Sequence, residues 1–157
     1  MNERSEISLE DLYSPEILAL ATRLEPGGAL AEAQGEAARV SRLCGSRVRA
    51  WARVDDQGRV AGFAQEVHAC ALGQASAAIL GQHVVGASLE ELEQGRALLR
   101  AMLKEGAPPP EDEPWRDLAA LAPVRGYPPR HDAVLLPFDA AIAAVREALA
   151  NAGLSVS

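Results

Sequence analysis

A strict two-residue alternation between positions 47 and 55 constrains the fold more than any other feature of the sequence. Its apolar members are Val48, Ala50, Ala52 and Val54, and the residues between them are Arg47, Arg49, Trp51 and Arg53. This period is typical of a strand that buries one face and leaves the other, here the arginine and tryptophan face, in solvent. Asp56-Gln57-Gly58 then has the composition of a tight turn, and residues 59–67 predict the returning strand. The chain is therefore expected to contain an antiparallel hairpin.

Patterns on either side of the hairpin predict the other elements. Ser14 and Pro15 are typical of a helix N-cap and a first helical position, and Ser88-Leu89-Glu90-Glu91 has the spacing of a capping box. The predicted elements are a helix from Ser14, an edge strand over residues 37–43, a short helix over 71–80, a helix from Ser88 to Gly106, a short helix over 115–121, and a last helix that ends at 151–153 and that Pro137 restarts or kinks. Together they predict an α+β fold, in which a small antiparallel sheet of about three strands packs against four to five helices.

Length and charge narrow the class of protein. The 157 residues suit one domain with a single core, spanning residues 1–157, of which the polar residues 1–8 are expected to be frayed. The formal net charge of −7 argues against nucleic acid or an anionic membrane as a partner. No apolar run approaches the ~20 residues of a membrane-spanning helix. The N-terminal residues lack the basic and apolar regions of a signal peptide, which predicts a cytoplasmic protein.

The two cysteines of the chain flank the predicted hairpin. Cys44 lies just before its first strand, and Cys70 lies at the start of the helix that follows its second strand. Because a hairpin returns the chain to its starting edge, the two thiols are expected near each other, with Cys70 where helix N–H groups favour a thiolate. This arrangement predicts a site for soft metal ions or sulfur. The alternative is that both cysteines are small buried apolar residues, as free cysteines commonly are.

The order of several short motifs along nearly the whole chain resembles the NifU/IscU-type iron–sulfur cluster assembly scaffolds. The matching segments are Tyr13-Ser14-Pro15-Glu16-Ile17, Cys44-Gly45, Cys70, Gln74-Ala75-Ser76 and the last helix over residues 135–145. Each motif is short, and their common order is what makes the resemblance specific. The resemblance implies a single NifU N-terminal-like domain with a SufE/NifU-like fold.

The sequence departs from the family pattern at two ligand positions. Ser46 stands where the family has an aspartate, and Ala133 or Val134 stands where it has a third cysteine. Imidazole and carboxylate groups can replace a thiolate on iron or zinc. The metal ligands implied in this way are Cys44, Cys70, His131 and Asp132. For His131 the alternative is a solvated histidine near a helix start.

By the same resemblance, the protein is expected to be a scaffold and not an enzyme. It would accept sulfur from a cysteine desulfurase, hold an iron–sulfur cluster transiently on Cys44 and Cys70, and pass it to apo iron–sulfur proteins. The shortage of thiolates leaves two alternatives: a degenerate scaffold that acts as an adaptor of the desulfurase, or a zinc-containing accessory of sulfur transfer. The chain itself is expected to be a monomer or a weak homo-oligomer.

Overall fold

The computed structural model describes residues 12–154, so the fraying predicted for residues 1–8 lies outside the described part of the chain. At its centre is one antiparallel sheet of three strands in the order β1-β2-β3. The strands are β1 (Gly35–Val40), β2 (Arg47–Val54) and β3 (Val60–His68). The helices are α2 (Pro15–Thr22), α3 (Ala71–His83), α4 (Leu89–Lys104) and α5 (His131–Asn151), with the 3₁₀ helices η1 (Arg116–Gly126) and η2 (Pro128–Arg130). The predicted α+β fold is confirmed.

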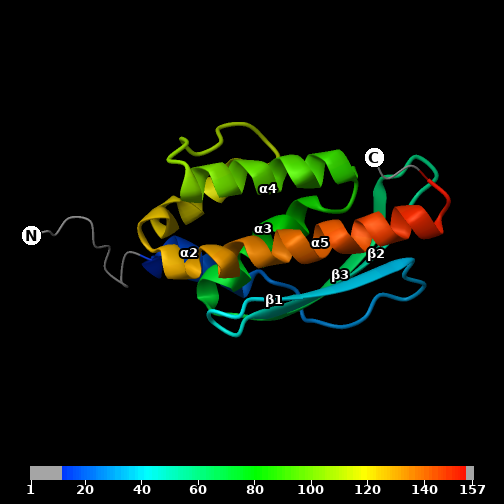
Figure 1. Cartoon of the computed structure of the whole chain (residues 1–157), viewed down its shortest axis with the longest axis horizontal. Helices are drawn as coiled ribbons and strands as arrows, with labels where there is room; N and C mark the ends of the chain where they lie inside the picture. The colour runs from blue at the N-terminus through cyan, green and yellow to red at the C-terminus, as the bar shows by residue number, and fades with distance from the viewer. Residues whose placement is uncertain (1–11, 155–157) are drawn as a thin grey trace, which may run out of the picture.

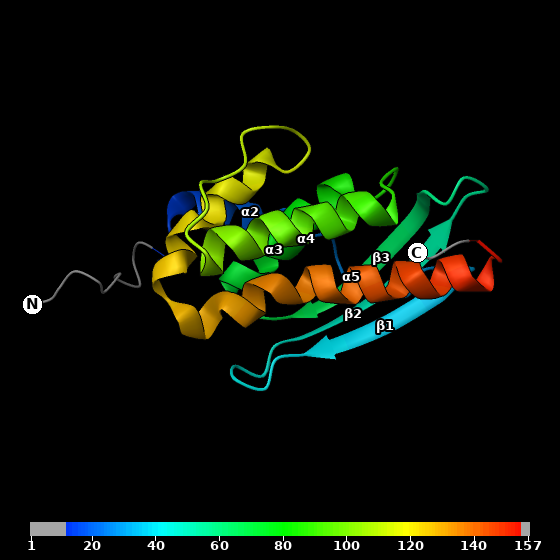
Figure 2. The same ribbon diagram turned by 45° about the horizontal axis from the view of Figure 1, so that its top comes forward.

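The helices α3, α4 and α5 lie on one side of the sheet. α5 packs lengthwise on β1 and β2, α3 packs beside it, and α4 lies on α5 as an outer layer (Figures 1 and 2). The apolar face of β2 points into this helical layer, and its members Val48, Ala50, Ala52 and Val54 are all buried. The contact is closest at Gly35 of β1, where an added Cβ would overlap the Ala144 carbonyl oxygen and lie 2.5 Å from the Ala148 nitrogen. Small residues on both elements permit this close approach.

The opposite face of the sheet is less exposed than the sequence predicts. Trp51 was expected in solvent among the arginines, but only 8% of its surface is accessible. The segment between α2 and β1 runs along this face: the Arg53 guanidinium donates to the Ala31 carbonyl at 2.9 Å, and Gly27 lies against Glu66. The prediction was therefore wrong for Trp51. The irregular segment contacts this face at Arg53 and Glu66, whereas Arg47 and Arg49 are exposed as predicted.

The predicted helix starts are confirmed for α2 and α4. Ser14 Oγ accepts from the Ile17 amide at 3.2 Å, and Ser88 and Glu91 form the capping box of α4. The last helix, α5, begins at His131 and continues through Pro137, so Pro137 does not start a new helix. A proline inside a helix has no N–H to donate to the carbonyl four residues earlier. No helix within residues 12–154 has the length and apolar character needed to cross a membrane.

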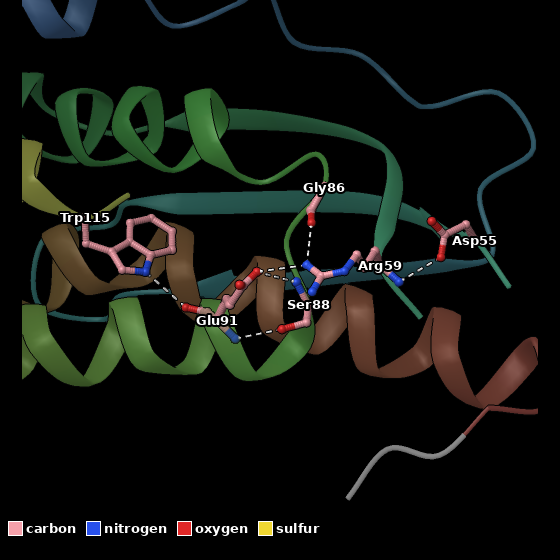
Figure 3. A network of polar contacts seen from close by, with 6 residues as sticks. All are labelled: Asp55, Arg59, Gly86, Ser88, Glu91 and Trp115. Atoms are coloured by element: carbon pink, nitrogen blue, oxygen red, sulfur yellow. Dashed lines mark hydrogen bonds and ion pairs between the residues drawn. The ribbon is translucent and has the colours of Figure 1, made fainter. Parts of the chain in front are cut away.

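A polar network holds the end of the sheet that carries the β2–β3 turn (Figure 3). Arg59 donates to the Gly86 carbonyl at 2.8 Å and lies 3.3 Å from the Glu91 carboxylate. Glu91 also accepts from the Ser88 amide at 3.0 Å, and its own carbonyl accepts from the Trp115 indole at 3.2 Å. The network joins the β2–β3 turn, the α3–α4 connection, the start of α4 and the N-cap of η1. The network lies at the end of the β2–β3 hairpin opposite the pair Arg47 and His68.

Candidate functional site

The register of the hairpin places both cysteines beyond the same end of the sheet. Arg47, the first residue of β2, pairs with His68, the last residue of β3. Cys44 precedes Arg47 by three residues and Cys70 follows His68 by two. Both are free thiols; Cys44 is exposed, and Cys70 is partly exposed. The candidate site therefore lies at the end opposite the network of Figure 3.

Cys44 lies on a tight turn between β1 and β2. The Ser41 amide donates to the Ser46 carbonyl at 2.9 Å, and the Gly45 amide donates to the Ser41 carbonyl at 2.8 Å. Gly45 has φ +74°, a left-handed conformation that glycine adopts without strain. The turn places Cys44 Sγ 3.0 Å from Ser46 Oγ and 3.5 Å from Ser41 Oγ. Both serines are buried, so their hydroxyl groups are held beside the exposed thiol.

These neighbours favour the thiolate of Cys44. Burial alone would raise the pKa of Cys44, but hydrogen bonding with the Ser41 and Ser46 side chains and with the Ser46 backbone outweighs it. The positive charge of Arg130 acts in the same direction, and the pKa of Cys44 is lowered overall. The thiolate is the form of cysteine that attacks sulfur and binds metal.

Cys70 is the N-cap residue of α3, as the sequence predicts. Its carbonyl accepts from the Gln74 amide at 2.9 Å, but its thiol makes no capping hydrogen bond. The Cys70 sulfur therefore does not cap the N-terminus of α3. A close contact at Gly73 holds this end of α3 against α5: an added Cβ there would lie 3.2 Å from the Ala133 carbonyl oxygen.

Arg130 is hydrogen-bonded to Tyr13 at the end of the sheet that carries the cysteines. Its Nη1 donates to the Tyr13 hydroxyl at 2.9 Å. Burial would lower the pKa of Arg130, but interaction with the Cys70 thiol and with Tyr13 raises it overall. Burial and the charge of Cys70 together raise the pKa of Tyr13, so its hydroxyl stays protonated at neutral pH. The site therefore contains a guanidinium cation, hydrogen-bonded to Tyr13, whose charge helps to lower the pKa of Cys44.

The other two predicted ligands lie in different environments. His131 is buried, and its Nε2 lies 2.9 Å from the Val124 carbonyl oxygen and 3.2 Å from that of Arg125. Because both partners are acceptors, Nε2 carries the proton in this arrangement. Asp132 is exposed and lines a groove beside the turn of Cys44. Within residues 12–154, no three His, Cys, Asp or Glu side chains are grouped so that they could hold a metal ion. Ligation by His131 and Asp132 stays a prediction.

Three contributors to the site were missed at the level of sequence. Ser46 was interpreted only as the loss of an aspartate, although its spacing from Cys44 could have marked it as a hydrogen-bond partner. Ser41 gave no such signal. Arg130 is distant from both cysteines in the chain, and no local pattern connects it to them.

The fold and the site define a small α+β protein with two free thiols at one end of its sheet. A NifU-like protein (N-terminal) from Brucella abortus has a similar crystal structure, with a TM-score of 0.83 and 41% sequence identity over 89% of this chain and 96% of that chain. The chain belongs to the NifU/IscU-type scaffold family.

A more distant structure shares the fold. It is that of a putative iron–sulfur cluster assembly scaffold protein for the SUF system from Fervidobacterium islandicum AW-1, with a TM-score of 0.76, 21% identity, and coverage of 88% of this chain and 99% of that chain. No protein-family model and no curated protein sequence matches the chain.

Proposed function

We propose that this protein is a scaffold of iron–sulfur cluster assembly, with iron and sulfide as its transient cargo. Cys44 and Cys70 would hold the cargo, and the protein would then pass it to apo iron–sulfur proteins. The observation that carries this proposal is the placement of two free thiols beyond one end of the sheet, one of them exposed on a turn that lowers its pKa. Membership of a scaffold family supports it.

The exposed thiol of Cys44 is suited to receive the sulfur. In this step the Cys44 thiolate attacks the outer sulfur of a persulfide on a cysteine desulfurase. The donor's S–S bond breaks, the donor cysteine leaves as a thiolate, and a new S–S bond forms on Cys44. Ser41, Ser46 and Arg130 favour the attacking anion before the step. Arg130 also lies beside Cys70, where it offsets negative charge as sulfur accumulates.

A second candidate function follows from the residues at the position of the family's third cysteine. Ala133 is 1% exposed and Val134 is fully buried, and neither side chain can bind metal. With only two cysteine side chains, the site has fewer ligands than a four-coordinate cluster or zinc site requires. This favours, as the alternative, an adaptor that binds the desulfurase without building clusters, or a zinc-containing accessory completed by His131 or Asp132.

Anaerobic reconstitution with iron and sulfide tests the scaffold function. The wild-type protein should develop the charge-transfer absorption of an iron–sulfur cluster, and Cys44→Ala and Cys70→Ala should each abolish it. Circular dichroism of each variant checks that the fold is retained.

The alternatives give different results. A colourless wild-type protein that still binds the desulfurase would contradict the scaffold function and favour the adaptor. Stoichiometric zinc in the protein as purified, lost in His131→Ala or Asp132→Ala, would favour the zinc-containing accessory.

A further inference from the structure

A groove between α4, α5 and the turn that carries Cys44 is a separate surface feature of the molecule. It consists of two adjoining hollows. One, of about 820 Å³, lies between α4 and α5, and the other, of about 460 Å³, extends to Ser41, Arg42 and Leu43. The two hollows share lining residues, among them Arg96 and Asp139, and form one continuous groove. We propose that this groove, called here the α4–α5 groove, docks an acidic, partly apolar segment of a partner protein next to Cys44.

The charge of the α4–α5 groove is opposite to that of the whole chain. Its basic residues are Arg39, Arg42, Arg96, Arg100, Lys104 and Arg146, and its acidic residues are Glu93, Glu105, Asp132 and Asp139. The groove thus has an excess of two positive charges, whereas the chain has 15 basic and 22 acidic residues and a net charge of −7. A basic groove on an acidic protein selects an acidic occupant, because other surfaces of the protein repel it.

Three of the four carboxylates in the groove are already paired. Asp139 pairs with Arg96, Glu105 with Arg100, and Glu93 with Arg146. Among the residues that the structure describes, Arg39, Arg42 and Lys104 form no ion pair, and all three are exposed. These three cations are available to the carboxylates of a partner.

Apolar side chains indicate that the occupant is a protein segment and not a nucleic acid. Leu43 is 73% exposed and Val40 is 58% exposed, and both lie at the end of the groove next to Cys44. Leu135, Leu136 and Ile142 form the floor of the groove but are buried, so Leu43 and Val40 supply its exposed apolar surface. A peptide with apolar anchors among its carboxylates can use both kinds of contact. Phosphate groups would use only the cations of the groove and would leave the exposed side chains of Leu43 and Val40 without a contact.

The docking proposal stands independently of cluster assembly. It requires only the groove and the neighbouring turn, and it applies to any acidic protein that reacts with Cys44. Arg42 and Leu43 lie in the groove and directly precede Cys44 in the chain. A segment bound there is placed beside the exposed thiol.

Fluorescence anisotropy with a labelled peptide tests the groove. The probe is a helical peptide of about 20 residues, roughly 30 Å long, with leucines on one face and glutamates on the other. The affinity of the peptide is compared between two double variants. The groove variant is Arg42→Glu/Lys104→Glu, and the distal variant, outside the groove, is Arg23→Glu/Arg116→Glu. Both double variants change the net charge by the same amount, and all four positions are exposed.

The expected results distinguish binding in the α4–α5 groove from non-specific electrostatic attraction between peptide and protein. The wild-type protein should bind the peptide more weakly as salt rises from about 0.05 M to about 0.3 M. The groove variant should lose at least about tenfold in affinity, and the distal variant should stay within about twofold. No binding of the peptide, equal losses in both variants, or tighter binding of a single-stranded RNA of equal length would each overturn the proposal.

A disulfide-exchange measurement tests the position of the occupant relative to Cys44. The same peptide carries a terminal cysteine as a mixed disulfide with thionitrobenzoate. The Cys44 thiolate attacks the peptide sulfur, the mixed disulfide breaks, and thionitrobenzoate leaves as a coloured anion. In a Cys70→Ala background, the acidic peptide should react about tenfold faster than its Glu-to-Gln counterpart, and Arg42→Glu/Lys104→Glu should remove the difference. Equal rates for the two peptides would overturn docking beside Cys44.

Discussion

At the scale of single residues, the surroundings of Cys44 favour a sulfur anion. Ser46 Oγ lies 3.0 Å from Cys44 Sγ, at a position where an aspartate would place a second negative charge. A hydroxyl group donates a hydrogen bond to a thiolate, whereas a carboxylate repels it. Ser46 therefore has no carboxylate that could bind a metal, but its hydroxyl group stabilises the thiolate of Cys44.

Replacing Ser46 by alanine should slow the alkylation of Cys44. The pKa of Cys44 is lowered in the wild-type protein, so its thiolate persists to a lower pH than in free cysteine, and the rate falls only as the pH drops through that lowered pKa. Ser46→Ala removes one cause of the shift. We expect the pH midpoint to move upward and the rate at pH 7 to fall by about threefold to tenfold.

The measurement is the rate of reaction with iodoacetamide between about pH 5 and pH 10, in a Cys70→Ala background so that only Cys44 reacts. Thr22→Ala, an exposed hydroxyl group on α2, is the control and should leave the profile unchanged. Superimposable profiles for wild type and Ser46→Ala would show that the serine does not influence the thiol.

At the scale of elements, the packing of β1 on α5 depends on one small residue. Gly35 has no side chain, and the backbone of α5 occupies the space that a Cβ would need. The Glu36 amide then donates to the Glu147 carboxylate at 2.8 Å, and the Asn151 amide group donates to the Gln34 carbonyl at 2.7 Å. These contacts attach the edge strand to the C-terminal half of α5.

Gly35→Ala should destabilise the protein, because the new methyl group pushes β1 away from α5. Inserting one methyl group into a close-packed contact typically costs about 1–3 kcal/mol in the free energy of unfolding. Gly81→Ala in α3 is the matched control: its Cβ would lie an ordinary 3.4 Å from Gln65 Nε2. Alanine is the better helix former by up to about 1 kcal/mol, so this variant should be neutral or stabilised. Urea denaturation measures both, and equal stabilities for the two variants would contradict the packing argument.

At the scale of the whole molecule, the core and the candidate site are separate. The core is built around Trp115 and Phe138, whose rings meet edge to face at a centroid distance of 5.5 Å. Cys44 is exposed, and Cys70 only packs against the margin of the core. Apolar side chains therefore hold the elements together, and we expect the fold to be independent of a metal ion. Small domains that fold around a structural zinc ion behave in the opposite way.

Removal of metal should leave the fold intact. Treatment with a chelator, or the double change Cys44→Ala/Cys70→Ala, should shift the midpoint of urea unfolding by no more than the equivalent of about 1 kcal/mol. The measurement is a denaturation curve followed by tryptophan fluorescence, since Trp115 reports on the core. Loss of the cooperative transition after chelation would show that a metal ion supports the fold.

The sequence by itself determined the local elements of this protein. The alternation in β2, the turn at Gly58 and the caps at Ser14 and Ser88 each depend on residues within one strand or one helical turn, so periodicity and capping could predict them. The hairpin also placed Cys44 and Cys70 at one end of the sheet, because its register follows from a short turn.

Only the tertiary structure decided which distant residues meet. The burial of Trp51, the hydrogen bond between Arg130 and Tyr13, and the basic groove between α4 and α5 all depend on how elements pack in space. Such contacts join residues that share no periodic pattern, and they form only when the apolar faces of the helices are buried against the sheet.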